Sequence, residues 1–221
     1  MGMVVLFLLC QTCHAAVSVS PVIIEAVEVQ EGQTFEIVCR NQGEEEIPLQ
    51  LSLALFDQDE MGGVVFLEDT EATKKARALL TLDKEEFWLA PNGEEAVQVR
   101  LGGDDFDHLY AVLFVRSSEP GLQIRFAVLF LLTTLARQGE VTVSSFHHQE
   151  EALIFILQNT GLSHGLWEGV LHCFDAADRL GEKRSLQSGL VLAGRSRAVE
   201  VALPSWVERV EIVSMESGRS R

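Results

Sequence analysis

Basic residues are scarce in this sequence of 221 residues. Seventeen Lys and Arg stand against 33 Asp and Glu, which gives a formal net charge of -16 at pH 7. Nucleic-acid binding draws much of its affinity from basic side chains that neutralise phosphates, and attraction to anionic lipid needs the same charge. We therefore expect no nucleic-acid partner and no docking on anionic lipid. The acidic residues are interpreted as a solvated surface that keeps the protein soluble.

Helical periodicity and catalytic motifs are also missing. No long window repeats apolar residues at helical spacing, and the best helix candidate, Asp69–Leu80, is short enough to lie in a loop. The sequence contains no Gly-x-Ser-x-Gly motif, no phosphate-binding loop and no dinucleotide fingerprint. These absences predict a protein that is not an enzyme and needs no cofactor.

Metal-binding patterns are equally sparse. His147 and His148 are adjacent, so they point to opposite faces of a strand, and no Cys or His pair has zinc spacing. The acidic runs Asp57–Glu60 and Asp104–Asp107 lack a complete calcium-loop pattern. We predict no metal site, and we expect surface or turn positions for the histidines, His164 included.

Charged residues are absent from residues 1–16, in which an apolar stretch from Met3 to Cys10 is followed by Ala15 and Ala16. This pattern predicts a signal peptide cleaved after Ala15 or Ala16, although no basic residue precedes the apolar stretch. About eight apolar residues cannot cross a bilayer that requires about 20. We expect an exported protein, periplasmic or extracellular, with no membrane insertion after signal removal.

Cysteine is rare outside that leader. Only Cys39 and Cys173 remain, and both alternate with apolar residues in candidate strands. They fall in different halves of the chain, so a disulfide within one half is not available. We predict two buried thiols that act as small hydrophobic side chains, without a bridge between them.

Short apolar runs separated by Gly, Asn and Asp fill the rest of the chain, which is typical of β-strands. The candidate strands are Val17–Val29, Thr34–Asn41, Pro48–Phe56, Val64–Leu67, Leu79–Leu82, Phe87–Leu89, Ala96–Leu101, Leu109–Val115, Leu122–Leu135, Val141–Phe146, Ala152–Asn159, Leu166–Phe174, Leu186–Leu192, Ala198–Leu203 and Val207–Val213. Their spacing predicts an all-β protein made of immunoglobulin-like sandwiches.

A weak internal repeat predicts that one sandwich type is used twice. Residues 35–43 and 153–161 are both alternating strands closed by Asn-x-Gly, at Asn41 and Asn159, where we expect positive φ in the turn. Residues 89–99 and 192–201 match in the same order. We predict two domains, 17–137 and 138–221, the second of which is short of a final strand and leaves an edge to be covered.

Four features together resemble the periplasmic pilus-assembly chaperones, the PapD-like family, as a distant member. They are the exported start that leads into Val17–Pro21, the strand that ends at Asn41, the segment Phe87–Gly93, and the long strand Leu109–Val115 followed by another long strand. The resemblance implies a chaperone whose last strand of the first domain complements a secreted, pilin-like subunit by strand addition.

The corresponding strand here is Leu122–Leu135, which is apolar on both faces. On one face we expect the client-binding residues Leu122, Ile124, Phe126, Val128, Phe130 and Leu132. A half-exposed strand is normally polar on one face, so something is expected to cover the second face. The cover is either a client or another subunit, or else the second domain itself or a central place in the sheet.

The family holds its client's terminal carboxylate with a basic pair, and here the only nearby candidates are Arg125 and Arg137. Neither stands at the family's motif position, because the first strand and Thr133–Ala136 carry no basic residue. The alternative function is a structural or adhesive module of an extracellular assembly, which associates with itself through the unfinished edge of the second domain.

Overall fold

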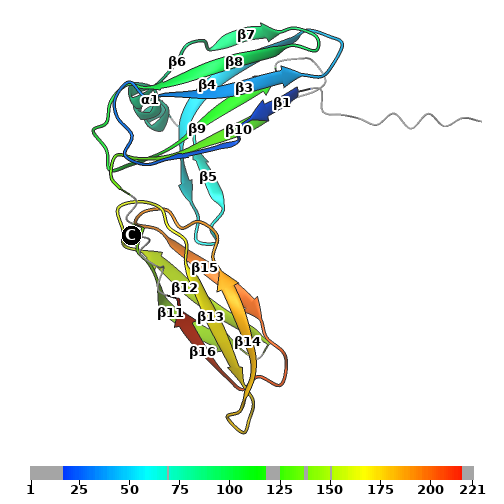
Figure 1. Cartoon of the computed structure of the whole chain (residues 1–221), viewed down its shortest axis with the longest axis vertical. Coiled ribbons are helices and arrows are strands. Elements are labelled where there is room, and N and C mark those ends of the chain that lie inside the picture. The colour runs from blue at the N-terminus through cyan, green and yellow to red at the C-terminus, as the bar shows by residue number, and fades with distance from the viewer. Residues whose placement is uncertain (1–16, 69, 118–124, 137–138, 150, 216–221) are drawn as a thin grey trace, which may run out of the picture.

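The computed structural model describes residues 17–68, 70–117, 125–136, 139–149 and 151–215. These residues form two β-sandwiches placed end to end (Figure 1). The first sandwich contains β1 (Val17–Ser20), β2 (Ile23–Ala26), β3 (Thr34–Asn41), β4 (Ile47–Gln58), β5 (Val64–Leu67), α1 (Thr70–Leu79), β6 (Leu80–Leu82), β7 (Glu86–Leu89), β8 (Glu94–Leu101), β9 (His108–Ser117) and β10 (Arg125–Thr133). The predicted all-β fold is confirmed.

Two sheets close over the core of the first sandwich. One has the strand order β1-β3-β8-β6, and the other has β2-β10-β9-β4-β5, with β7 on the same edge of β4 as β5. Alternate residues of each strand point inward, and Ile37, Val97 and Leu113 are fully buried between the sheets. The predicted helix is present as α1, and it contributes the buried Ala76 to this core.

The first strand differs from the prediction. Instead of one strand over Val17–Val29, β1 pairs with β3 in one sheet, and β2 pairs in parallel with β10 in the other. Pro21, which follows a cis peptide bond, lies between them. Proline has no N–H to donate to a ladder, so the pairing is interrupted and the chain crosses from one sheet to the other there.

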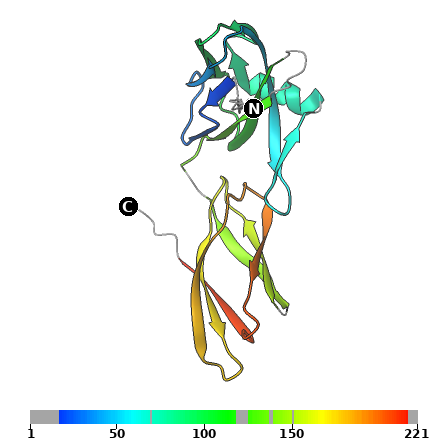
Figure 2. The same cartoon turned by 90° about the vertical axis from the view of Figure 1, so that its right-hand side faces the viewer.

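The second sandwich is smaller. Its strands are β11 (Val141–Gln149), β12 (Ala152–Asn159), β13 (Glu168–Phe174), β14 (Leu180–Gln187), β15 (Ser196–Ala202) and β16 (Arg209–Ser214). They form two three-stranded sheets, β11-β12-β15 and β14-β13-β16, among the described residues. Phe155, Trp167 and Leu171 are buried between these sheets. The two views agree that the β4–β5 hairpin of the first sandwich reaches toward β15 (Figures 1 and 2).

The two Asn-x-Gly segments have matching hydrogen bonds. Asn41 Nδ2 donates to the carbonyls of Leu89 and Ala90, and its Oδ1 accepts from the Gly43 N–H at 2.8 Å. Asn159 repeats the pattern in the second sandwich, donating to Val191 O and accepting from the Gly161 N–H.

The expected positive φ is not at these residues. Positive φ angles occur instead at Asn92 (52°) and at Gly194 (69°). Asn92 follows the segment that the Asn41 side chain contacts, and Gly194 follows the segment that the Asn159 side chain contacts. The asparagines act through their side chains, which replace missing backbone partners in a turn.

The predicted strand Leu186–Leu192 is wrong. The strand β14 ends at Gln187, and Leu190 and Leu192 lie in the loop that follows it. Both leucines contact the first sandwich rather than the core of their own. Their hydrophobicity therefore reflects a joint between sandwiches, which alternation alone cannot distinguish from a strand.

Candidate functional site

The edge of β10 that faces away from β9 is only partly covered. The whole of β10 pairs with β9, from Arg125 opposite Arg116 to Thr133 opposite His108. On the other side β2 pairs only with Leu129–Leu132. On this side, no strand within the described ranges lies beside residues 125–128, and we call this backbone edge the free edge.

The free edge presents unpaired backbone groups. Leu129 donates its N–H to Val22 O at 2.9 Å, so its backbone groups face β2. Because these groups alternate in direction along a strand, Arg125 and Ala127 turn their N–H and C=O groups to the same side, beyond the end of β2. An unpaired edge of this kind is a template for pairing with another extended chain.

The inward face of β10 holds the residues predicted to bind a client. Val128, Phe130 and Leu132 are fully buried in the core of the first sandwich, and Phe126 packs against that core half-buried. Phe130 meets Phe35 edge-on, with ring centroids 5.9 Å apart. Leu122 and Ile124 lie outside the described residues. The placement of Val128, Phe130 and Leu132 corrects the prediction of direct client contact, because these three side chains fill their own core.

The outward face of β10 enters a second apolar cluster, which we call the joint cluster. Its members come from β4, β9, β10 and the loop after β14: Ala54, Phe56, Tyr110, Val112, Phe114, Ala127, Leu129, Leu131, Leu190, Leu192 and Ala193. Leu131 and Leu192 are 3% and 2% exposed. The second sandwich therefore covers much of this face, so apolarity on both faces of β10 gives no evidence for a client. The alternative interpretation, a cover supplied by the second domain itself, is the one that the structure supports.

Hydrogen bonds fix the loop 190–193 on the first sandwich. Gln58 Nε2 donates to Leu190 O at 2.7 Å, and Gln58 Oε1 accepts from the Leu192 N–H at 3.2 Å. The Tyr110 hydroxyl accepts from the Ala193 N–H at 3.1 Å. Burial in this joint raises the pKa of Tyr110 above its usual value. The loop thus satisfies its backbone groups with side chains of the other sandwich.

Two further contacts hold the joint. His164 is fully buried, and its Nε2 lies 2.9 Å from Glu25 Oε1 on β2. Arg195 forms a two-pronged ion pair with Asp57. His164 lies in the loop between β12 and β13, as a turn position would, but the prediction of a surface position is wrong because the side chain is buried. It links the second sandwich to the strand that covers part of β10.

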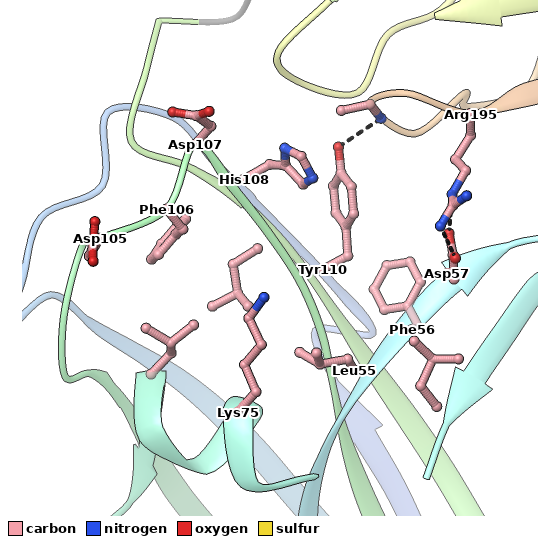
Figure 3. Close-up of a pocket in the computed structure, with 14 residues that line it drawn as sticks. Leu55, Phe56, Asp57, Lys75, Asp105, Phe106, Asp107, His108, Tyr110 and Arg195 are labelled. Carbon is pink, nitrogen blue, oxygen red and sulfur yellow. Dashed lines mark hydrogen bonds and ion pairs between the residues drawn. The ribbon is translucent and has the colours of Figure 1, made fainter. Parts of the chain in front are cut away.

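A pocket of about 490 Å³ opens beside the joint (Figure 3). Its charged lining comes from both sandwiches and includes Lys75, Asp105 and the Asp57–Arg195 pair. Figure 3 shows Tyr110 and His108 on the side nearer the second sandwich. Among the described residues no three His, Cys, Asp or Glu side chains are grouped to hold a metal ion.

Arg125, a predicted carboxylate anchor, already contacts a carboxylate of its own chain. Its Nη2 lies 2.7 Å from Glu68 Oε1, and Arg116 Nη2 lies 2.8 Å from Glu68 Oε2. The Arg125 guanidinium also stacks 3.7 Å from the Phe114 ring centroid. The hydrogen bond from Arg125 is the main cause that lowers the pKa of Glu68. Arg137, the other candidate, lies outside the described residues.

The cysteines match the prediction. Cys39 and Cys173 are both buried and free. Burial raises the pKa of the Cys39 thiol to about 11, so this thiol is protonated and unreactive at neutral pH. The one helix that the structure describes, α1, is too short to cross a membrane.

Sequence reasoning missed the residues that form the joint. Gln58 carries no motif, and the hydrophobicity of Leu190 and Leu192 predicts a strand. Tyr110 offered one usable signal, because it is the single tyrosine of the sequence and stands in the otherwise apolar run Leu109–Val115. A lone hydroxyl in such a strand requires a hydrogen-bond partner, which here is the backbone of the second sandwich.

Sequence comparisons find no matching family model and no matching curated protein. Solved structures do match over nearly the whole chain. A chain of the chaperone–tip adhesin complex of CFA/I fimbriae biogenesis aligns at a TM-score of 0.57 and 7% identity, covering 90% of this chain and 98% of its own. The class 5 fimbriae chaperone CfaA aligns at a TM-score of 0.56 and 9% identity, covering 93% and 94%.

A third match comes from the CsuC–CsuE chaperone–tip adhesion subunit pre-assembly complex of the archaic chaperone-usher Csu pili of Acinetobacter baumannii. It aligns at a TM-score of 0.55 and 11% identity and covers 90% of this chain and 98% of its own. At these identities the likeness concerns the fold. The chain has the two-sandwich fold of the periplasmic pilus-assembly chaperones, as its sequence resemblance predicted.

Proposed function

We propose that this chain is an exported assembly chaperone of the pilus or fimbria type. It binds a secreted, pilin-like subunit by strand addition at the free edge of β10. The single observation that carries the proposal is that β2 covers only Leu129–Leu132, so that residues 125–128 have no strand partner on the side away from β9 among the described residues. The fold shared with fimbrial chaperones supports the same function.

The chemistry of the free edge suits an extended client. The backbone groups of Arg125 and Ala127 would supply hydrogen bonds that do not depend on the client's sequence, and neighbouring side chains would supply selectivity. Among the predicted client-binding residues that the structure describes, Phe126 is the one that remains half-exposed. Arg125 stands at the same edge and could hold a client carboxylate only by sharing or replacing Glu68.

The test uses a substitution that blocks strand pairing at the free edge without removing a hydrogen bond that stabilises the sandwich. Ala127→Pro deletes an N–H that faces the free edge, a position where proline is tolerated in sheets, whereas Ala127→Val keeps the N–H. We expect tagged wild-type chain and Ala127→Val to retain one secreted subunit from the native envelope, and Ala127→Pro to lose it while its unfolding temperature stays within a few degrees. Equal recovery of the subunit by all three chains would overturn the proposal.

A second candidate function is a structural or adhesive module of an extracellular assembly. The observation that favours it is the edge strand β16, which pairs only with β13 among the described strands. This function requires self-association through that edge. A strictly monomeric chain at high concentration, measured by sedimentation, would exclude it.

A further inference from the structure

The second sandwich has room for one more strand beside β16. Met215 donates its N–H to Glu168 on β13 at 2.9 Å. By alternation, Val210, Ile212 and Ser214 turn their backbone N–H and C=O groups away from β13. Over the described part of the chain, no strand pairs with that side of β16. Three residues of β16 thus present backbone groups to an unfilled position.

A groove of about 560 Å³ lies at this position, between β11 and β16. Its lining includes Val143, Phe146 and Ile212 together with serine and threonine hydroxyls, and it contains no charged residue. Val143 and Ile212 belong to the core of the second sandwich but are only half-buried, and Phe146 is 56% exposed. The floor of the groove is therefore core surface that no other described segment covers.

The opposite side of the same sandwich, between β14 and β15, carries contacts of its own. There Arg184 of β14 donates to the Ala202 carbonyl of β15 at 2.7 Å. The edge of β15 also receives the β4–β5 hairpin, because the Ala198 N–H donates to Glu60 O at 2.7 Å. The edges of β14 and β15 are thus partly occupied, by one arginine side chain and by the hairpin.

The charge and sequence of the chain restrict what can fill the groove. The six residues that follow Met215, Glu216 to Arg221, contain no apolar side chain to pack on Val143 and Ile212. A second copy would bring a further net charge of -16 to an acidic molecule, and like-charged molecules repel. An uncharged groove beside free backbone groups favours an uncharged extended segment from another polypeptide.

We propose that the groove between β11 and β16 is a second strand-acceptor site. Its occupant is an extended, uncharged segment of a different protein, with apolar residues at alternate positions. The backbone of that segment pairs with Val210, Ile212 and Ser214, while its apolar side chains cover Val143 and Ile212. The site lies in the other sandwich from the free edge of β10, so it does not depend on the proposed chaperone function.

The test uses a soluble peptide of roughly eight residues, a typical strand length, with alternating valine and threonine and a lysine tail. We expect saturating peptide to slow amide hydrogen exchange at Val210, Ile212 and Ser214 about tenfold or more, with no change at Ala127 on the free edge. A control peptide with serine in place of each valine should have no effect. Unchanged exchange with the valine peptide would overturn the proposal.

Two surface variants locate the binding. Phe146→Asp places a charge in the groove, whereas Val213→Asp places one at a residue that is 45% exposed and does not line it. We expect Phe146→Asp to weaken peptide binding at least about tenfold and Val213→Asp to leave it within about twofold. Equal loss in both variants would contradict binding in the groove.

Joining the segment covalently to the chain makes the test independent of how tightly a free peptide binds. Extending the full chain beyond Arg221 with the valine–threonine segment should raise the unfolding temperature of the second sandwich by about 5 °C, and the serine version should not. No difference between the two extensions would contradict the site. A concentration-dependent dimer of the unextended chain that the valine segment abolishes would assign the groove to a second copy, and would equally overturn the proposed occupant.

Discussion

The two faces of β10 meet different neighbours although both are apolar. The inward face, with Val128 and Phe130, packs on the other sheet of the first sandwich, and the outward face, with Leu131, packs on a loop of the second. Apolarity on both faces of a strand therefore shows that the strand has two covers, without showing that one of them is a separate molecule. The part of β10 left for a partner is its backbone edge.

The largest effect is expected on the inward face. Phe130→Ala removes a fully buried ring that packs on Phe35, and such truncations cost about 3–5 kcal/mol. We expect a loss of this size in the free energy of unfolding, measured by urea denaturation. A loss below about 1 kcal/mol would mean that the inward face is not the structural one.

A smaller effect, and a different one, is expected at the joint. Leu192→Ala truncates a buried side chain that rests on the outward face. We expect a cost of about 2 kcal/mol, at the low end for leucine, because the joint can relax by a movement between sandwiches. Since burial raises the pKa of Tyr110, a loosened joint should also bring that pKa down toward its usual value of 10.0.

The single tyrosine makes this titration unambiguous by ultraviolet absorbance. Val201→Ala is the matched control, because Val201 packs on the core of the second sandwich instead of the joint. We expect it to lower stability without moving the pKa of Tyr110. An unchanged tyrosine pKa in Leu192→Ala would contradict the role of this loop as the cover of the outward face.

The smallest effect concerns Glu68, which is held by Arg116 and Arg125 at the end of the outward face. The arginines lower the pKa of this carboxylate in the folded state. The ionised Glu68 therefore adds to the free energy of unfolding above its unfolded pKa near 4.5, and this stabilisation is lost as pH falls through the lower folded pKa. Because all three side chains are partly exposed, we expect Glu68→Gln to cost less than about 1 kcal/mol at pH 7.

That difference between wild type and Glu68→Gln should shrink in acid, which denaturation curves at several pH values would measure. Glu71→Gln is the control, since its exposed partner Lys74 lies one turn away on α1. A cost for Glu68→Gln that does not change with pH would mean that the two arginines do not stabilise the carboxylate.

The sequence predicted the parts of the fold that follow local rules. The alternation of apolar residues predicted a strand over Ala152–Asn159, and β12 has these bounds. The Asn-x-Gly repeat identified two segments with matching hydrogen bonds, at Asn41 and Asn159. Alternation also placed Phe126, Val128, Phe130 and Leu132 together on one face. It could not say which face of β10 points to the core, because both are apolar.

The joint could not be predicted, because its residues are hydrophobic in the same way as residues of a domain core. Leu190 and Leu192 are buried against another sandwich, and their hydrophobicity looks the same in sequence as that of a strand. His164 is buried because Glu25, far away in the sequence, supplies a partner. Contacts between separate sandwiches depend on how the sandwiches meet, which no local pattern encodes.

The free edge of β10 can be tested most directly by residue-resolved amide hydrogen exchange on the chain alone. We predict that the Ala127 amide, which faces the uncovered edge, exchanges at least roughly 100-fold faster than the Leu129 amide, which donates to Val22. Equal protection of the two amides would show that another segment already covers this edge, and would contradict strand addition at β10.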